Sequence, residues 1–162
     1  MSAVLKDEPR DEPRDSPRLE VMRERDLEEV LAIENAIYSH PWTRGNFGDS
    51  VRAGYDCRTW RLGSELVGYF ILLAAAGEAH LLNLSVAASR QRSGHGTALL
   101  REALELARRR GARSLFLEVR PSNQAAQALY ARFGLRRIAV RRGYYPAHSG
   151  REDALVYTVA LA

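Results

Sequence analysis

Two glycines, Gly94 and Gly96, stand between a predicted strand and a predicted long helix, in the run Gln-Arg-Ser-Gly-His-Gly. A glycine lets backbone N–H groups approach a ligand closely, because no Cβ stands in the way. The N–H groups at a helix start lack partners, and the helix dipole there favours an anion. The pattern therefore predicts a pyrophosphate cradle, with added charge from Arg90 and Arg92. A plain turn between strand and helix is the alternative interpretation.

The second chemistry-bearing segment contains Glu118, which interrupts the apolar run 115–119. A carboxylate in such a strand is costly unless it has partners, faces a wet cleft or titrates. The alternative is a solvated glutamate at an edge. Asn123 follows and can cap a helix, and Tyr130 lies two turns further on roughly the same helix face. A core tyrosine is the alternative interpretation of Tyr130.

Other phosphate sites and metal sites do not fit the sequence. A nucleoside-triphosphate loop requires a lysine before Thr97, and a dinucleotide site requires three spaced glycines within a repeated strand–helix–strand fold. The four histidines are scattered and Cys57 is the only cysteine, so neither a metal site nor an internal disulfide is predicted.

The elements that position these residues follow from hydrophobic periodicity and turn signals. Asp26 and Glu29 predict a capping box for a first helix, and a second short helix is expected after Thr43. The dipeptide Gly63-Ser64 predicts a two-residue hairpin turn. Strands are predicted over 19–22, 56–62, 65–75, 78–86, 113–119, 135–142 and 154–160, and further helices over 97–110 and 123–133. An antiparallel meander followed by a strand–helix–strand unit predicts an α/β fold with a mixed sheet.

The chain of 162 residues is long enough for one domain with a core of its own. Residues 7–18 read Asp-Glu-Pro-Arg twice and then Asp-Ser-Pro-Arg, with proline every fourth residue and no apolar side chain to bury. We therefore expect a disordered tail over 1–17 and one domain over 18–162. No apolar run is long enough for a membrane-spanning helix, and no secretory signal is recognisable, so a cytoplasmic protein is expected.

Charge is distributed unevenly along the chain. Residues 90–162 contain fourteen arginines and five acids, whereas residues 19–89 contain six arginines and ten acids. The basic half suits a polyanionic ligand, and the acidic half could favour a cationic one. Solvated arginine is the alternative. No basic run is interleaved with aromatic residues, so direct nucleic-acid binding is not predicted.

Together, the segments 91–96 and 123–135 resemble the GNAT superfamily of N-acetyltransferases. Tyr38-Ser39-His40-Pro41-Trp42-Thr43, Leu117-Glu118-Val119-Arg120, Arg142-Gly143-Tyr144-Tyr145-Pro146 and Gly150-Arg151-Glu152-Asp153-Ala154 further resemble the bacterial RimI-type ribosomal-protein alanine N-acetyltransferases. The sequence departs from the usual pattern at Ala88, Arg90, His95, Leu135 and Tyr157, none of which removes a catalytic group.

The resemblance implies a sheet of about seven strands with about four helices, whose splayed central strands form an acetyl-CoA cleft. It implies Glu118 as general base, Tyr130 as general acid, and acetyl-CoA as co-substrate without a metal. The implied cofactor contacts are Leu84, Ser85, Val86, Arg92, Ser93, Gly94, His95, Gly96, Thr97 and Asn123.

The family acetylates the N-terminal alanine of the eighteenth small-subunit ribosomal protein, so that N-terminal peptide is the implied partner. Trp42 and Tyr145 are candidate contacts for the peptide, although a core aromatic is an equally good interpretation of Trp42. A small-molecule amine acetyltransferase, acting on an amino sugar or a polyamine, and a non-catalytic acetyl-CoA-binding module are the alternatives.

Overall fold

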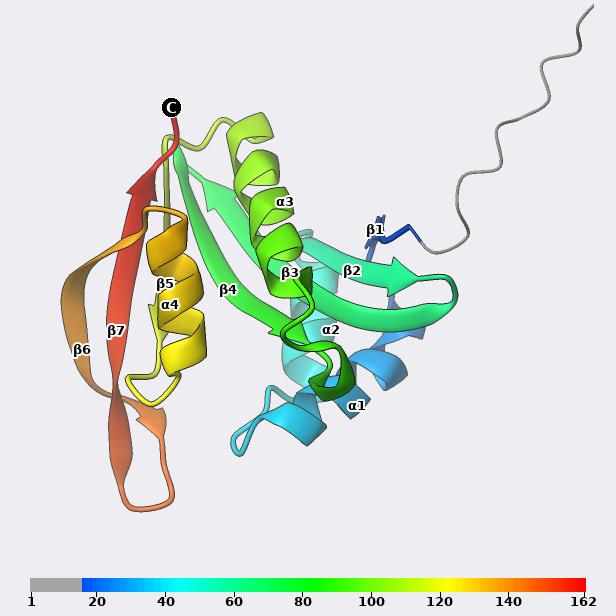
Figure 1. Cartoon of the computed structure of the whole chain (residues 1–162), viewed down its shortest axis with the longest axis horizontal. Coiled ribbons are helices and arrows are strands. Elements are labelled where there is room, and N and C mark those ends of the chain that lie inside the picture. Colours follow the sequence, from blue (N-terminus) through cyan, green and yellow to red (C-terminus); the bar gives the residue numbers. More distant parts are fainter. Residues whose placement is uncertain (1–15) are drawn as a thin grey trace, which may run out of the picture.

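The computed structural model describes residues 16–162, and the predicted tail lies outside the described residues except for its last two. The described chain forms a mixed α/β fold with one seven-stranded sheet, in the order β1-β2-β3-β4-β5-β7-β6 (Figure 1). The strands are β1 (Arg18–Val21), β2 (Asp56–Leu62), β3 (Glu65–Ala75), β4 (Glu78–Val86), β5 (Ser114–Val119), β6 (Arg136–Pro146) and β7 (Arg151–Ala160). The α-helices are α1 (Leu27–Ile37), α2 (Arg44–Arg52), α3 (His95–Arg109) and α4 (Gln124–Arg132).

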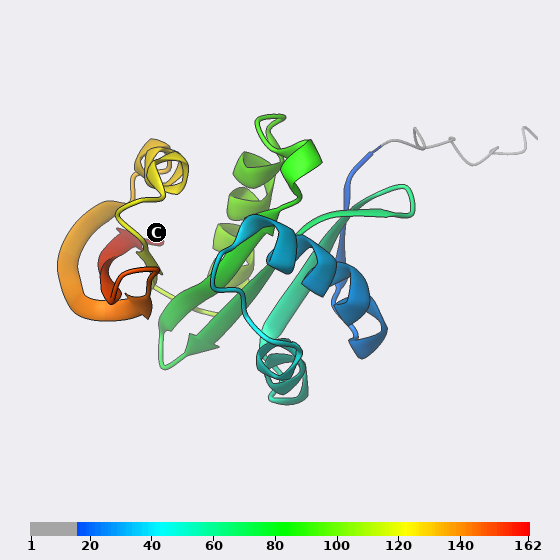
Figure 2. The ribbon, with the colours of Figure 1, turned by 90° about the horizontal axis from the view of Figure 1, so that it is seen from below.

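Helices cover both faces of this sheet. Helices α3 and α4 lie on one face and α1 and α2 on the other (Figure 2). The stripe of Leu99, Leu100, Ala103 and Ala107 packs α3 onto the first face, as its helical spacing predicts. Phe47 of α2 and Val30 of α1 pack with Tyr69 in a second core on the opposite face. These two cores hold the central strands in place from both sides.

The central strands β4 and β5 are paired where both begin and separate towards their ends. Their parallel pairing is limited to Glu78↔Ser114, Ala79↔Leu115 and His80↔Phe116. Strand β4 stays paired with β3, but a register shift leaves Leu82 without a partner, because Ile71 pairs with Asn83 and Leu72 with Leu81. Such a bulge bends a strand and increases its twist. The open region between residues 81–86 of β4 and 117–119 of β5 is called the wedge below.

Most predicted elements are confirmed, with exceptions at the start of α1 and in the lengths of β6 and β7. The predicted capping box of Asp26 and Glu29 is wrong: a 3₁₀ turn over Glu24–Asp26 precedes α1, and the Asp26 side chain does not cap α1. Its carboxylate instead accepts from the Arg23 N–H at 2.8 Å and from Arg61 at 2.9 Å. Strands β6 and β7 are longer than predicted because they continue as a hairpin through Pro146 and Arg151.

Candidate functional site

The open edge of β4 presents backbone groups to the wedge. The N–H of Ala87 donates to Val67 on β3 at 2.8 Å, so the amide of Ser85, two residues earlier, also faces β3. The amides of Leu84 and Val86 then face the opposite edge, where β5 has moved away. Among the predicted contact residues on this strand, these two can therefore bind a ligand through their backbone.

A second set of backbone groups lies where α3 begins. Arg92 and Gly94 adopt left-handed φ angles of 61° and 84°, so the chain turns sharply before the helix. The first helical bond runs from the Ala98 N–H to the Gly94 carbonyl, which leaves the amides of residues 95–97 without intrahelical partners. No atom outside its chain neighbours lies within 4 Å of an ideal Cβ at Gly94, so this turn opens to solvent. These features fit the predicted anion cradle.

The side chains near this cradle differ in their exposure and in the partners that they bind. Arg90 is held by Glu65 at 2.5 Å, so its charge is already paired. Ser93 is exposed in the turn and Thr97 is half-buried in the first turn of α3. The His95 Nδ1 accepts from the Trp60 indole N–H at 3.1 Å, so the His95 side chain is tied to β2. His95 can therefore contribute to the cradle through its backbone amide.

We expect Gly94→Val to weaken acetyl-CoA binding by about 10-fold or more. A β-branched residue strongly disfavours a φ of 84°, so the loop must change conformation and misplace its amides. Isothermal titration with coenzyme A measures the effect, and Gly111→Val is a matched control, because Gly111 has a φ of 80° at the far end of α3. An unchanged dissociation constant in Gly94→Val would contradict the cradle.

Glu118 lies beside the point where β4 and β5 separate, and its side chain is only 6% exposed. Burial rules out a solvated edge glutamate. Its Oε2 lies 2.5 Å from the His80 Nε2. Its Oε1 is buried and has no hydrogen-bond partner among the described residues. The nearest cation to Oε1 is the guanidinium of Arg141, at 3.7 Å.

Tyr130 is also buried, and the hydroxyls of two other tyrosines lie near it. Burial first, and then the nearby hydroxyls of Tyr38 and Tyr145, raise the pKa of Tyr130 above its ordinary value. Burial and then the Glu118 carboxylate raise the pKa of Tyr145. The structure thus brings Glu118 of β5, Tyr130 of α4 and Tyr145 of β6 into one neighbourhood with Tyr38, which directly follows α1.

Asn123 serves as the N-cap of α4. Its Oδ1 accepts from the Ala126 N–H at 3.1 Å, which satisfies one of the otherwise unpaired amides of the helix start. The capping role that the sequence offered as an alternative is therefore confirmed. The side chain is exposed, so a contact with a ligand through its amide NH₂ stays a prediction.

A buried hydrogen-bond network supports β4 from the sheet face covered by α1, and the sequence pattern did not indicate it. Glu34 is 2% exposed; the Tyr69 hydroxyl donates to it, as do the Asn83 amide at 3.3 Å and the Trp42 N–H at 3.1 Å. The Ser85 hydroxyl donates its proton to the Asn83 Oδ1 at 2.7 Å. Because it has only one proton to donate, it accepts a hydrogen bond from the Tyr38 hydroxyl, also at 2.7 Å. Burial raises the pKa of Tyr38 to about 12, so that hydroxyl keeps its proton.

We expect Glu34→Ala to lower the free energy of unfolding by about 2–4 kcal/mol, because it leaves several buried donors without an acceptor. Glu28→Ala, on the same helix, is the matched control. Glu28 is 84% exposed, and Arg44 is its only ion-pair partner in the described part of the chain, so its loss should cost less than about 1 kcal/mol. Urea denaturation measures both variants. Equal losses would contradict the importance of the buried network.

The two candidate peptide contacts lie on different segments. Trp42 packs against Phe47 with ring centroids 5.2 Å apart, so it belongs in part to the core, as the alternative interpretation held. Tyr145 is covered by the guanidinium of Arg120, at 4.3 Å from its ring centroid. The loop before α2 and the β6–β7 turn approach each other at His40 and His148, whose rings are 6.3 Å apart.

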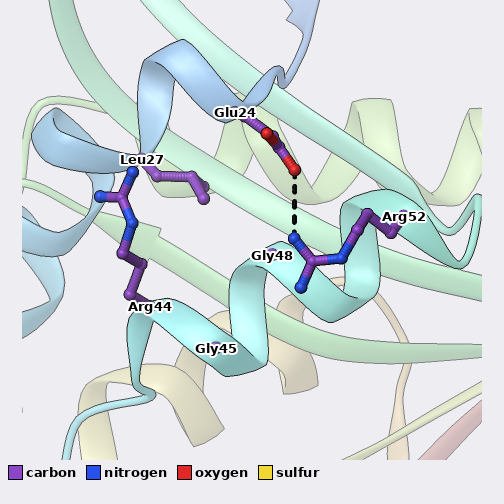
Figure 3. Close-up of a pocket in the computed structure, with 6 residues that line it drawn as sticks. All are labelled: Glu24, Leu27, Arg44, Gly45, Gly48 and Arg52. Atoms are coloured by element: carbon purple, nitrogen blue, oxygen red, sulfur yellow. Dashed lines mark hydrogen bonds and ion pairs between the residues drawn. The ribbon is translucent and has the colours of Figure 1, made fainter.

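Two features of the described residues lie outside the wedge and contain none of the predicted site residues. A surface pocket between α2 and the 3₁₀ turn is lined by Leu27, Gly45 and Gly48 and is flanked by the Arg52–Glu24 ion pair at 3.1 Å (Figure 3). None of the predicted site residues lines it. Burial raises the pKa of the Cys57 thiol to about 11, which makes it a poor nucleophile at neutral pH.

Residues 16–162 contain no cluster of three or more side chains arranged to hold a metal ion. None of the helices described there has the length and apolar character needed to cross a membrane.

Comparison with known proteins gives a consistent result. Residues 22–135 match the acetyltransferase (GNAT) family. The [ribosomal protein bS18]-alanine N-acetyltransferase of Escherichia coli K12 is 34% identical over 137 residues, which cover 85% of this chain and 93% of the relative. That of Haemophilus ducreyi is 32% identical over 144 residues, covering 88% and 99%. The crystal structure of the Escherichia coli ribosomal-protein-S18-alanine N-acetyltransferase aligns with a TM-score of 0.84 and 31% identity, covering 91% of this chain and 95% of the other.

Proposed function

Because the chain belongs to the acetyltransferase (GNAT) family, we propose that it transfers the acetyl group of acetyl-CoA to the N-terminal alanine of ribosomal protein bS18. The observation that carries this proposal is the separation of β4 and β5 after His80 and Phe116. It places a free backbone edge, a buried carboxylate and the amides of a helix start around one wedge. Relatives that span nearly the whole chain are bS18-alanine N-acetyltransferases, which supports the choice of substrate.

The wedge has the groups needed to hold acetyl-CoA, which supplies the acetyl group as a thioester. The amides of Leu84 and Val86 bind the pantetheine part, and the amides of residues 92–97 bind the diphosphate. Ser85, whose amide faces β3, acts through its side chain, which holds Tyr38. The Val86 N–H stabilises negative charge that develops on the carbonyl oxygen.

The proton transfers fall to two side chains. Glu118 takes a proton from the attacking amine, and Tyr130 gives a proton or a hydrogen bond to the leaving sulfur. Tyr130 is suited to the acid role because its raised pKa keeps the hydroxyl protonated across the working pH range. Transfer is direct, in a complex of the enzyme with both substrates, because the only cysteine is buried and protonated.

An N-terminal amine is a chemically easier acceptor than a lysine. The reference pKa of an α-amine is about 7.8 and that of lysine about 10.4. At pH 7 roughly one α-amine in seven is neutral, against about four lysines in ten thousand. This difference in pKa corresponds to roughly 3.5 kcal/mol. Deprotonating an α-amine therefore requires that much less free energy from the carboxylate base than deprotonating a lysine.

The acceptor peptide enters beside Trp42 and Tyr145. Both residues lie on segments that flank the wedge, the loop before α2 and the β6–β7 hairpin. Residues 19–89 contain ten acids and six arginines, so this half of the chain has a net negative charge that suits a basic peptide. We place the protein in the cytoplasm, where ribosomal proteins are made, and expect it to act on the protein rather than on RNA.

A defined acetylation assay tests the proposal. The purified chain is incubated with acetyl-CoA and a peptide with the N-terminal sequence of bS18, and the product is mapped by tandem mass spectrometry. We expect one acetyl group on the alanine α-amine and none on the same peptide with a formylated N-terminus. Turnover on spermidine or an aminoglycoside, with none on the free peptide, would favour the small-molecule alternative. Tight coenzyme A binding without turnover of any amine would favour the non-catalytic module.

A further inference from the structure

His80 lies at the point where β4 and β5 separate. It forms the last register pair of the two strands, with Phe116, and its ring stacks on Phe116 with centroids 4.3 Å apart and planes 20° apart. Glu118 lies two residues further along β5, so its side chain shares a face with Phe116. The stacked ring of His80 spans the two strands, and its Nε2 lies 2.5 Å from the Glu118 Oε2.

This contact makes the two oxygens of Glu118 different. An ionised carboxylate only accepts hydrogen bonds, so the His80 Nε2 must donate its proton to Oε2. Oε1 is fully buried and has no hydrogen-bond partner among the described residues. A buried polar atom without a partner is costly, and such atoms in a native structure call for an explanation. A reacting group that arrives with a proton to give provides one.

We propose that His80 is a positioning residue for the acetyl transfer: it holds Oε2 of Glu118 so that Oε1 is the atom that accepts the proton from the acceptor amine. In the step itself, the amine N–H bond breaks, an O–H bond forms at Oε1, and the nitrogen keeps the electron pair with which it attacks. The bond from His80 to Oε2 stays in place throughout. This inference rests on the proposed role of Glu118.

Two other groups near the Glu118 carboxylate are less well placed than His80 to fix its orientation. The Arg141 guanidinium, from β6, is 3.7 Å from Oε1, beyond hydrogen-bond distance, and its side chain is 52% exposed. Tyr145, also from β6, interacts with Glu118 electrostatically, and Arg120 covers its ring. His80 is 20% exposed and packed against Phe116, so it is the better-fixed partner.

Variants at position 80 separate positioning from packing. A glutamine side chain can place an NH₂ donor near the position of Nε2, whereas asparagine is too short and phenylalanine has no donor. We expect His80→Phe and His80→Asn to lower kcat at least 10-fold, with the coenzyme A dissociation constant and the melting temperature nearly unchanged. His80→Gln should recover most of the lost kcat. Equal losses in all three variants, or no loss in any, would overturn the proposal.

A double-mutant cycle tests whether His80 acts through Glu118. In a Glu118→Gln background, His80→Phe should change the residual rate less than about 2-fold, because the base it positions is already absent. A further loss as large as in the wild type would assign His80 an independent role and overturn the proposal.

Nitrogen NMR of the histidine ring tests the hydrogen bond without any acetyl transfer, so it stays informative even where the bS18 peptide is not a substrate. Selectively ¹⁵N-labelled full-length protein should show a proton on the His80 Nε2, and Glu118→Gln should shift that resonance. A His80 ring without a proton on Nε2, or a resonance unaffected by Glu118→Gln, would contradict the inferred contact independently of the enzyme's substrate.

Discussion

Glu118→Gln is expected to lower kcat for acetylation of the bS18 peptide by a factor of about 10²–10⁴, the usual contribution of a general base. Glutamine has the same shape and can still accept a hydrogen bond from His80, so the packing beside Phe116 should be kept. It cannot take a proton from the amine at neutral pH. The dissociation constant for coenzyme A should stay within about 2-fold of the wild type, because the proposed binding groups lie on β4 and α3.

The control for this variant is Glu105→Gln, on the solvent-exposed side of α3. Glu105 is 53% exposed and, among residues 16–162, pairs only with Arg108, one turn further along the helix. Steady-state kinetics with saturating acetyl-CoA should distinguish the two variants clearly. Full kcat in Glu118→Gln at pH 7 would show that another group, or water alone, removes the proton.

Tyr130→Phe is expected to lower kcat by roughly 10²-fold, at the lower end of the range for an acid catalyst. The loss should be smaller than for Glu118→Gln, because a thiol with a pKa near 8.5 leaves readily even without full protonation. Phenylalanine fills nearly the same volume, so the packing of α4 against β5 and β7 should persist. Tyr157→Phe is the matched control, because the Tyr157 hydroxyl is bound to Gln127 at 3.2 Å.

The pH dependence provides a second test of Tyr130. Its pKa is raised above the ordinary value of about 10, so the hydroxyl keeps its proton as the pH rises through 9. The wild type should therefore show no loss of kcat between pH 7 and 9 from this group. A tyrosine-dependent fall in kcat within that interval, absent in Tyr130→Phe, would mean that the hydroxyl ionises much earlier than its burial implies.

The sequence was sufficient for most of the fold because its signals are local. The bounds of β2, β3 and β4 were predicted to the residue, since apolar runs end at Gly63-Ser64 and near Gly77. The predicted capping at Asp26 was wrong because the Arg23 N–H and a tertiary ion pair with Arg61 of β2 engage its carboxylate. Local pattern carries no information about a partner 35 residues away.

The same distinction holds for the site. Glu118 stood out because a carboxylate interrupts an apolar strand, and Gly94 because of its place before a long helix. Glu34 occupies an apolar-stripe position on α1, a signal of burial that the sequence contains but that names no partner. His80 was recognised only as one of four scattered histidines, because its significance depends on a strand pairing that leaves it beside Glu118.

The most direct test of the central claim, that the wedge between β4 and β5 is the acetyl-CoA site, is a titration of the ¹⁵N-labelled protein with coenzyme A, followed by amide NMR. We predict the largest shifts for the amides of Leu84 and Val86 and of residues 92–97. We predict little change at Gly45 and Gly48, which line the surface pocket beside α2. Large shifts at that pocket, with unperturbed amides along β4 and at the start of α3, would contradict the account.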